Sequence, residues 1–133
     1  MSICENEELM IIIYVKDQEK SKIFYEQLLG HAPRLNVPGM TEFKLTNNVA
    51  LGIMPEEGIV RVLENKIVHP KTANGIPRSE IYFFVHDPDE YYTRLVSLGG
   101  SGISKVKLRN WGHNVAYGAD IDGHILAFAK KVE

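Results

Sequence analysis

The feature that most constrains the fold is an internal repeat. Residues 10–17 read Met-Ile-Ile-Ile-Tyr-Val-Lys-Asp and residues 80–87 read Glu-Ile-Tyr-Phe-Phe-Val-His-Asp, an offset of 87 − 17 = 70. The same offset places Leu28 on Leu98 and Gly30 on Gly100. Self-similarity at a fixed period indicates two copies of one supersecondary unit.

Each copy predicts a strand, a helix and three further strands. Asp17 and Asp87 are expected N-caps, and Gly30 and Gly99-Gly100 are expected C-terminal stops. Strand signals follow at 34–37, 40–46 and 49–54, and again at 102–105, 114–118 and 124–129. We predict an α+β fold: a single domain (1–133) of two tandem βαβββ modules forming a cup-shaped mixed sheet with helices on the outer face. The modules span about 9–54 and 80–130, and the linker 55–79 has a short helix or strand near 59–65.

Composition excludes several classes of partner. The chain has 133 residues and a net charge of −2, with basic residues scattered among acids, so we expect no nucleic-acid partner. The longest apolar run, residues 9–15, is too short to span a bilayer, and the preceding Glu5, Glu7 and Glu8 are unlike a secretory signal. Cys4 is the only cysteine, which excludes an internal disulfide. We therefore expect a cytoplasmic protein without a membrane partner.

Two segments resemble a known family. Residues 15–30, with Val-Lys-Asp before Ser-Lys-Ile-Phe-Tyr-Glu-Gln-Leu-Leu-Gly, resemble the first module of the glyoxalase/bleomycin-resistance/dioxygenase family. Residues 111–128, with Trp-Gly before a strand and Asp-Ile-Asp-Gly before the last strand, resemble its closing segment, although Ile121 replaces the usual proline. The resemblance covers residues 9–130 and implies the vicinal oxygen chelate fold and a homodimer. The family contains lyases, isomerases, dioxygenases, thiol transferases and non-enzymatic drug binders, so the fold leaves the activity open.

The resemblance also implies where a metal ion would bind. Metal-dependent members use a His, Glu or Gln from the first and last strands of each module, which correspond here to Met10, Gly52, Glu80 and Ala127. Only Glu80 suits a hard ion, so we predict no metal and no other cofactor. The histidines have no partner at ligand spacing and are expected at the surface or in turns: His31, His69, His86, His113 and His124.

Strand alternation predicts what lines the cup instead. If Met10 and Glu80 face the cup, the alternate residues of both first strands do so too, and Gly52 and Ala127 leave room at its floor. The predicted ligand-binding residues are mostly aromatic: Tyr14, Phe43, Met54, Tyr82, Phe84, Trp111 and Tyr117. Arg109 is a rim candidate for anions. An apolar, aromatic cup with one acid fits an aromatic or cationic organic ligand. For each aromatic the alternative is packing within the protein or against a dimer partner, and for Glu80 a solvated strand start.

Three functions follow from this pattern. The first is metal-independent binding of a small organic molecule in the cup. The second is a glyoxalase-related lyase or isomerase, either metal-free with Glu80 as the general base or with a non-standard metal site. The third is a dimeric interaction module without a ligand, in which Tyr14, Tyr82 and Phe84 fill the cup themselves.

Overall fold

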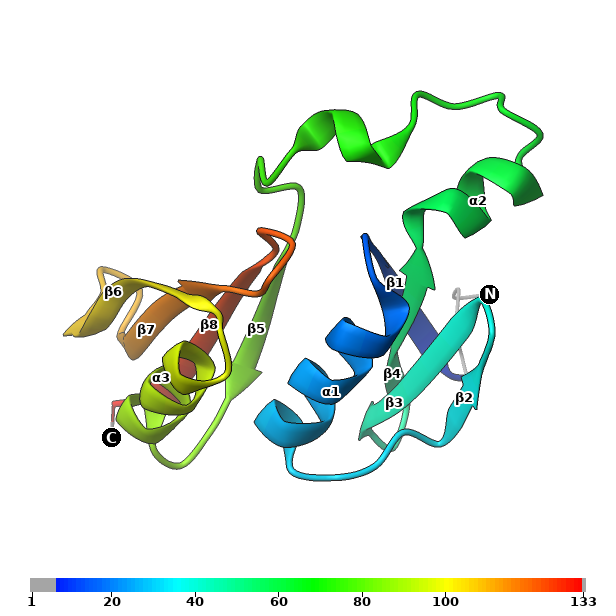
Figure 1. Ribbon diagram of the computed structural model, residues 1–133. Coiled ribbons are helices and arrows are strands. Elements are labelled where there is room, and N and C mark those ends of the chain that lie inside the picture. The colour runs from blue at the N-terminus through cyan, green and yellow to red at the C-terminus, as the bar shows by residue number, and fades with distance from the viewer. Residues whose placement is uncertain (1–6, 133) are drawn as a thin grey trace. The chain divides into compact units, whose positions relative to one another are not determined.

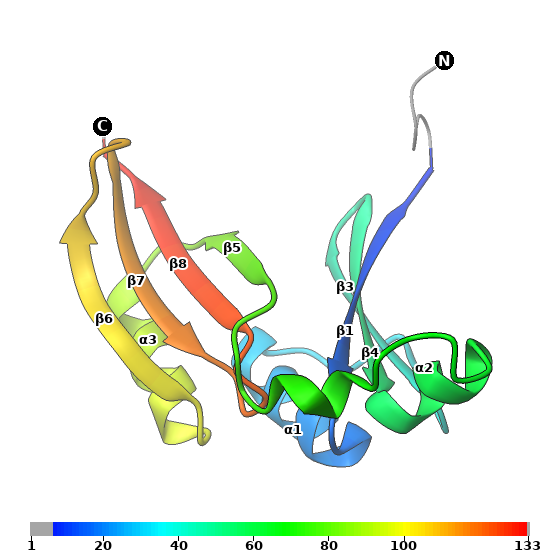
Figure 2. The same ribbon diagram turned by 90° about the horizontal axis from the view of Figure 1, so that it is seen from above.

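The computed structural model describes residues 7–132, and Cys4 and Glu5 lie outside these described residues. The chain divides into two compact units, one ending at Thr72 and the other beginning at Ala73. Each unit contains one four-stranded sheet (Figures 1 and 2). Within residues 7–132, no helix is long and apolar enough to cross a membrane.

The first unit begins with β1 (Leu9–Val15) and α1 (Gln18–Leu29) and continues with three strands, β2 (Leu35–Val37), β3 (Met40–Thr46) and β4 (Val49–Pro55). The strand order is β1-β4-β3-β2, with β1 parallel to β4 and the other pairs antiparallel. A short helix, α2 (Glu56–Val62), follows β4 directly. A short helix or strand was expected in the linker near 59–65. The structure has a helix there, and it begins three residues earlier, at Glu56.

The second unit repeats the plan after a 3₁₀ turn at Pro70–Ala73. It contains β5 (Glu80–Phe84), α3 (Pro88–Ser97), β6 (Ser101–Leu108), β7 (His113–Ala119) and β8 (Ile125–Lys131), in the order β5-β8-β7-β6. The parallel pair joins the first and last strands again. The predicted α+β fold of two tandem βαβββ modules is therefore confirmed, while the cup between them stays a prediction.

Helix capping follows the sequence signals. Asp17 Oδ1 accepts a hydrogen bond of 3.0 Å from the Lys20 amide, and Asp87 Oδ1 accepts one of 3.2 Å from the Glu90 amide. These bonds satisfy amides that have no partner inside the helix. Gly30 ends α1 with a φ of 83°, in the left-handed region that a side chain disfavours. The caps thus fix both helices at the predicted places.

The strand pairing shows how closely the two copies agree. Ile12 pairs with Gly52 in the first sheet, and Tyr82 pairs with Ala127 in the second. Ile12 and Tyr82 differ by 82 − 12 = 70 positions, the offset of the sequence repeat. Gly52 and Ala127 are therefore equivalent positions, as the family resemblance implied.

Each helix packs on an apolar face of its own sheet. In the second unit α3 lies against β6, β7 and β8 (Figure 1). Phe128 of β8 stacks on Phe83 at 5.8 Å and on Tyr91 of α3 at 5.4 Å between ring centroids. Leu95 of α3 is fully buried. Alternation then turns Tyr82, Phe84, Ala127 and Tyr117 toward the opposite face.

Phe43 does not lie on the face expected for it. Thr46 pairs with Val49 across the Asn47-Asn48 turn, but Lys44 then pairs with Ala50, so β3 carries one extra residue at a bulge. Without the bulge Phe43 would pair with Gly52. With it, Phe43 pairs with Leu51, and both side chains are fully buried. Phe43 is therefore a core residue of the first unit and makes an edge contact with His31.

Candidate functional site

The second sheet carries most of the predicted site residues on the face opposite α3. Two rows of paired residues cross its middle strands. Tyr82, Ala127 and Tyr117 form one row, and Phe84, Ala129 and Val115 form the next. Ala127 thus lies between two tyrosines, and Ala129 lies between Phe84 and Val115.

The middle of this face is already covered. Val115, Ala127 and Ala129 are fully buried, and Tyr82 and Tyr117 pack against them. Ala127 was expected to form an open floor, but aromatic side chains of the same unit fill the space above it. A ligand would therefore meet the outer surfaces and polar tips of the aromatic residues.

A short chain of hydrogen bonds joins three of these side chains. The indole Nε1–H of Trp111 donates to the Tyr82 hydroxyl oxygen at 2.9 Å. The same oxygen lies 2.7 Å from Nδ1 of His113. Because Trp111 supplies its own proton, the hydroxyl proton of Tyr82 is free to go to Nδ1. The bonds hold all three rings in place at the surface.

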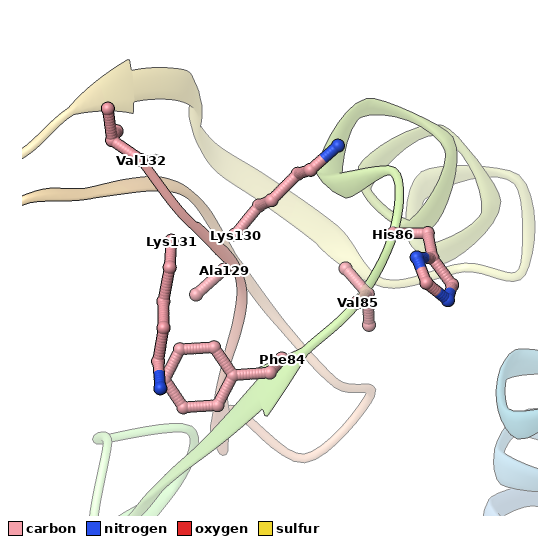
Figure 3. Close-up of a pocket in the computed structure, with 7 residues that line it drawn as sticks. All are labelled: Phe84, Val85, His86, Ala129, Lys130, Lys131 and Val132. Carbon is pink, nitrogen blue, oxygen red and sulfur yellow. The ribbon is translucent and has the colours of Figure 1, made fainter.

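Phe84 extends this cluster toward the end of β5. Its ring makes edge contacts with Tyr82 at 5.4 Å and with His113 at 5.2 Å. The ammonium of Lys131 lies 5.0 Å from the centroid of the Phe84 ring. Phe84 and Lys131 border an open recess of about 700 Å³ (Figure 3). The other residues that line it are Val85, His86, Ala129, Lys130 and Val132. Phe84 remains 55% exposed and Trp111 56% exposed, so both rings are accessible.

Tyr117 occupies the other end of the aromatic row. The Arg109 guanidinium carbon lies 5.0 Å from the centre of the Tyr117 ring, and Arg109 donates to the Val115 carbonyl at 2.8 Å. Burial raises the pKa of the Tyr117 phenol, and the charge of Glu80 raises it further. Tyr117 is therefore neutral near pH 7. Glu80 itself is exposed.

The corresponding face of the first unit is apolar and rich in methionine. A Cβ built on Gly52 would lie 2.9 Å from Ile12 Cγ1, 3.3 Å from Met40 Sδ and 3.4 Å from Met10 Sδ. Tyr14 pairs with Met54, and both are half-buried. These two predicted ligand residues lie in the first unit, apart in the chain from the cluster around Tyr82.

The donor set does not fit the metal site of the metal-dependent relatives. In the first unit the two equivalent positions provide a thioether and a glycine, and the methionines and Ile12 fill the space beside Gly52. In the second they provide the Glu80 carboxylate and the covered Ala127. Over residues 7–132, no three His, Cys, Asp or Glu side chains come close enough to hold a metal ion together.

The family model of the Glyoxalase/Bleomycin resistance protein/Dioxygenase superfamily matches residues 9–128. The chain belongs to this superfamily. Among curated proteins, no sequence matches it.

Several solved structures share the superfamily fold with this chain. A glyoxalase-related enzyme from Fulvimarina pelagi is 22% identical, with a TM-score of 0.79, and the match covers 96% of this chain and 89% of that one. A glyoxalase/bleomycin resistance protein/dioxygenase from Nocardioides is 18% identical, with a TM-score of 0.76 over 99% and 87%. A family enzyme from Burkholderia phytofirmans PsJN is 13% identical, with a TM-score of 0.75 over 92% and 97%. At these identities the likeness concerns the fold, and it assigns no activity to this superfamily member.

The sequence did not point to every residue of this cluster. His113 was expected to be a surface or turn residue, yet it is half-buried and bonded to Tyr82. Alternation from Tyr117 through Val115 would have placed it on the aromatic face. Lys131 pairs with His113 across β7 and β8, and the same argument would have found it.

Proposed function

We propose that the protein binds a small aromatic organic molecule without a metal ion, on the aromatic face of its second unit. The observation that carries this proposal is the pair of half-exposed rings, Phe84 and Trp111. Exposed aromatic rings usually turn freely, but hydrogen bonds and ring contacts hold these two in fixed positions. Fixed, accessible aromatic surface suits stacking with a planar ligand.

The metal-free part of the proposal rests on the donor set. Lewis-acid catalysis requires a bound ion with several protein ligands. The positions used by metal-dependent relatives offer one carboxylate, from Glu80. Binding by apolar and aromatic contact requires none of these ligands.

Trp111 provides a direct test because it is the only tryptophan of the chain. Its fluorescence should change saturably on titration with benzamide as a simple aromatic probe. Phe84→Ala should weaken this binding about tenfold, the factor equal to roughly 1.4 kcal/mol of lost ring contact. Val96→Ala removes an apolar side chain of similar exposure from α3, on the other face of the sheet, and should leave binding unchanged.

Metal dependence is tested on the same protein. Treatment with a chelator, or addition of Zn²⁺, Ni²⁺ or Mn²⁺, should change neither the melting temperature nor benzamide binding. Loss of binding on chelation and its return with one of these ions would contradict the proposal. Equal binding by the native protein and Phe84→Ala would contradict the assigned surface.

Catalysis by Glu80 as a general base is the competing function. Glu80 lies near Tyr117 and has no ion-pair partner within the described part of the chain. It is exposed, however, whereas a general base of this kind is expected in a dry pocket. If a substrate is found, loss of turnover in a folded Glu80→Gln variant would favour catalysis. The homodimer implied by the family remains a prediction that light scattering can test.

A further inference from the structure

The proposed ligand surface carries an excess of positive charge, although the whole chain has a net charge of −2. Lys131 and Arg109 lie over aromatic rings of this face. Lys107 pairs with Val115 and so belongs to the same face. Glu80, at the start of β5, is an acid of the same face. Among residues 7–132, three cations and one carboxylate on this face make it complementary to an anion.

The aromatic rings already have cations of their own. The Lys131 ammonium lies on the Phe84 ring and the Arg109 guanidinium on the Tyr117 ring. A cationic ligand would have to displace these groups and would meet their repulsion. The lone Glu80 suggested a cationic ligand from the sequence, but the neighbours that the fold brings together favour the opposite charge.

Lys131 is free to take a new partner. Its ammonium forms no ion pair with any acid among residues 7–132. It borders the recess beside Phe84, and Figure 3 shows its side chain reaching toward the ring. Lys130 lines the recess too, but its side chain points away from that ring. An anionic group entering this recess beside Phe84 would meet the ammonium directly.

His113 adds a directed donor beside Lys131. Its Nδ1 lies 2.7 Å from the Tyr82 hydroxyl oxygen, and in the tautomer in which Nδ1 accepts the hydroxyl proton, Nε2 carries the proton of the neutral ring. Protonation of the ring would leave Nε2 a donor as well. His113 pairs with Lys131 across the strands and contacts Phe84 at 5.2 Å. An ammonium and an imidazole N–H therefore border the same aromatic surface.

We infer that the ligand class is a small aromatic carboxylate, with its ring against Phe84 and Trp111 and its carboxylate at Lys131 and His113. The inference rests on the proposed function and adds the charge of the ligand. Charge-assisted hydrogen bonds to a carboxylate are roughly twice as strong as neutral ones.

Three planar probes of nearly equal shape test the inference on the full chain: benzoate, benzamide and benzamidine. Their charges are negative, neutral and positive. Calorimetry and Trp111 fluorescence should give benzoate about tenfold tighter binding than benzamide, as expected for one charge-assisted hydrogen bond, and benzamidine the weakest. The preference for benzoate should shrink as salt is added, because salt screens exposed charges.

Lys131→Gln should remove the preference for benzoate and leave benzamide binding unchanged. Lys20→Gln is the matched control, since it removes the same charge from an exposed residue of α1, in the first unit. Unchanged benzamide binding also shows that each variant is folded.

The outcomes separate this inference from the proposed function. Equal binding of the three probes, or tighter binding of benzamidine, overturns the inference if Phe84→Ala still weakens that binding. A preference for benzoate that survives in Lys131→Gln also overturns it. Binding of none of the probes, or binding indifferent to Phe84→Ala, overturns the proposed function itself.

Discussion

The indole nitrogen of Trp111 donates a hydrogen bond of 2.9 Å to the hydroxyl oxygen of Tyr82, 29 residues earlier in the chain. The bond ties the turn before β7 to β5, a strand two places away in the sheet. An indole that is more than half exposed would otherwise have several orientations in water. One phenol group therefore defines the position of the largest aromatic surface on this face.

Tyr82→Phe tests this relationship. It removes the hydroxyl but keeps the ring, so Trp111 and His113 both lose their partner. We expect a red shift of Trp111 emission and a loss of about 1 kcal/mol in unfolding free energy. Tyr92→Phe is the control, because the Tyr92 hydroxyl has no hydrogen-bond partner within residues 7–132. Identical emission from Tyr82→Phe and the native protein would show that the bond does not position the indole.

Phe43 and Phe84 form a matched pair of substitutions with opposite expected effects. Phe43 is fully buried in the first unit, so Phe43→Ala should cost about 3–5 kcal/mol of stability. Phe84 is 55% exposed, so Phe84→Ala should change stability by about 0.5 kcal/mol or less and act on ligand binding. Chemical denaturation together with benzamide titration measures both quantities. A large stability loss from Phe84→Ala would show that its ring is structural.

Gly100 and Gly58 provide a second pair, in which substitution by alanine should have opposite effects on stability. A Cβ on Gly100 would lie 2.7 Å from the Ala119 carbonyl oxygen and 2.7 Å from Leu95 Cδ2. We expect Gly100→Ala to lower the free energy of unfolding by about 1–3 kcal/mol, because the Ala119 backbone and the buried Leu95 side chain cannot both move to make room. In α2, a Cβ on Gly58 would meet nothing nearer than 3.8 Å, and Gly58→Ala should stabilise by about 0.5–1 kcal/mol. Thermal unfolding of both variants checks the two signs, and stabilisation by Gly100→Ala would refute the close approach.

The ion pair between Glu8 and Arg34 predicts a pH dependence of stability. Hydrogen bonds of 2.6 Å from both terminal nitrogens of Arg34 hold the pKa of Glu8 below its ordinary value. Because the folded pKa is the lower one, the contribution to stability is complete above the unfolded pKa and disappears as pH falls through the folded value. Glu8→Gln should therefore be less stable than the native protein near pH 7, with the difference vanishing in acid.

The control for this effect is Glu7→Gln, which removes the same charge from a residue without an ion pair in the described chain. Denaturation curves between pH 2 and 7 should show that Glu8→Gln is less stable than Glu7→Gln near pH 7. In acid the two variants should be equally stable. Equal curves at every pH would mean that water screens the Glu8 pair completely.

The repeat was enough to predict the order of strands and helices, because the capping aspartates and the apolar runs are local signals. Asp17 and Asp87 cap their helices without help from distant residues. The equivalence of Gly52 with Ala127 also followed from the repeat. These features depend on short stretches of sequence, so they can be predicted from a single chain.

Phe43 and His113 show where sequence reasoning failed. A bulge of one residue between Lys44 and Thr46 reverses every side chain beyond it, and nothing in the sequence around Leu45 marks the extra residue. His113 depends on a partner 31 residues away, Tyr82, so no local spacing could reveal the bond. The charge of the ligand surface likewise arises from distant parts of the chain: Lys107 of β6, Arg109 just after it, and Lys131 of β8.

Each sheet pairs its own first strand with its own last strand. Leu9 pairs with Val49, and within residues 7–132 no strand of the first sheet pairs with the second. Residues 9–55 are synthesised before the strand that starts at Glu80. The first unit can therefore complete its hydrogen-bonded ladder during translation, so the nascent chain has no need to hold an unpaired β1 edge until the second unit is made.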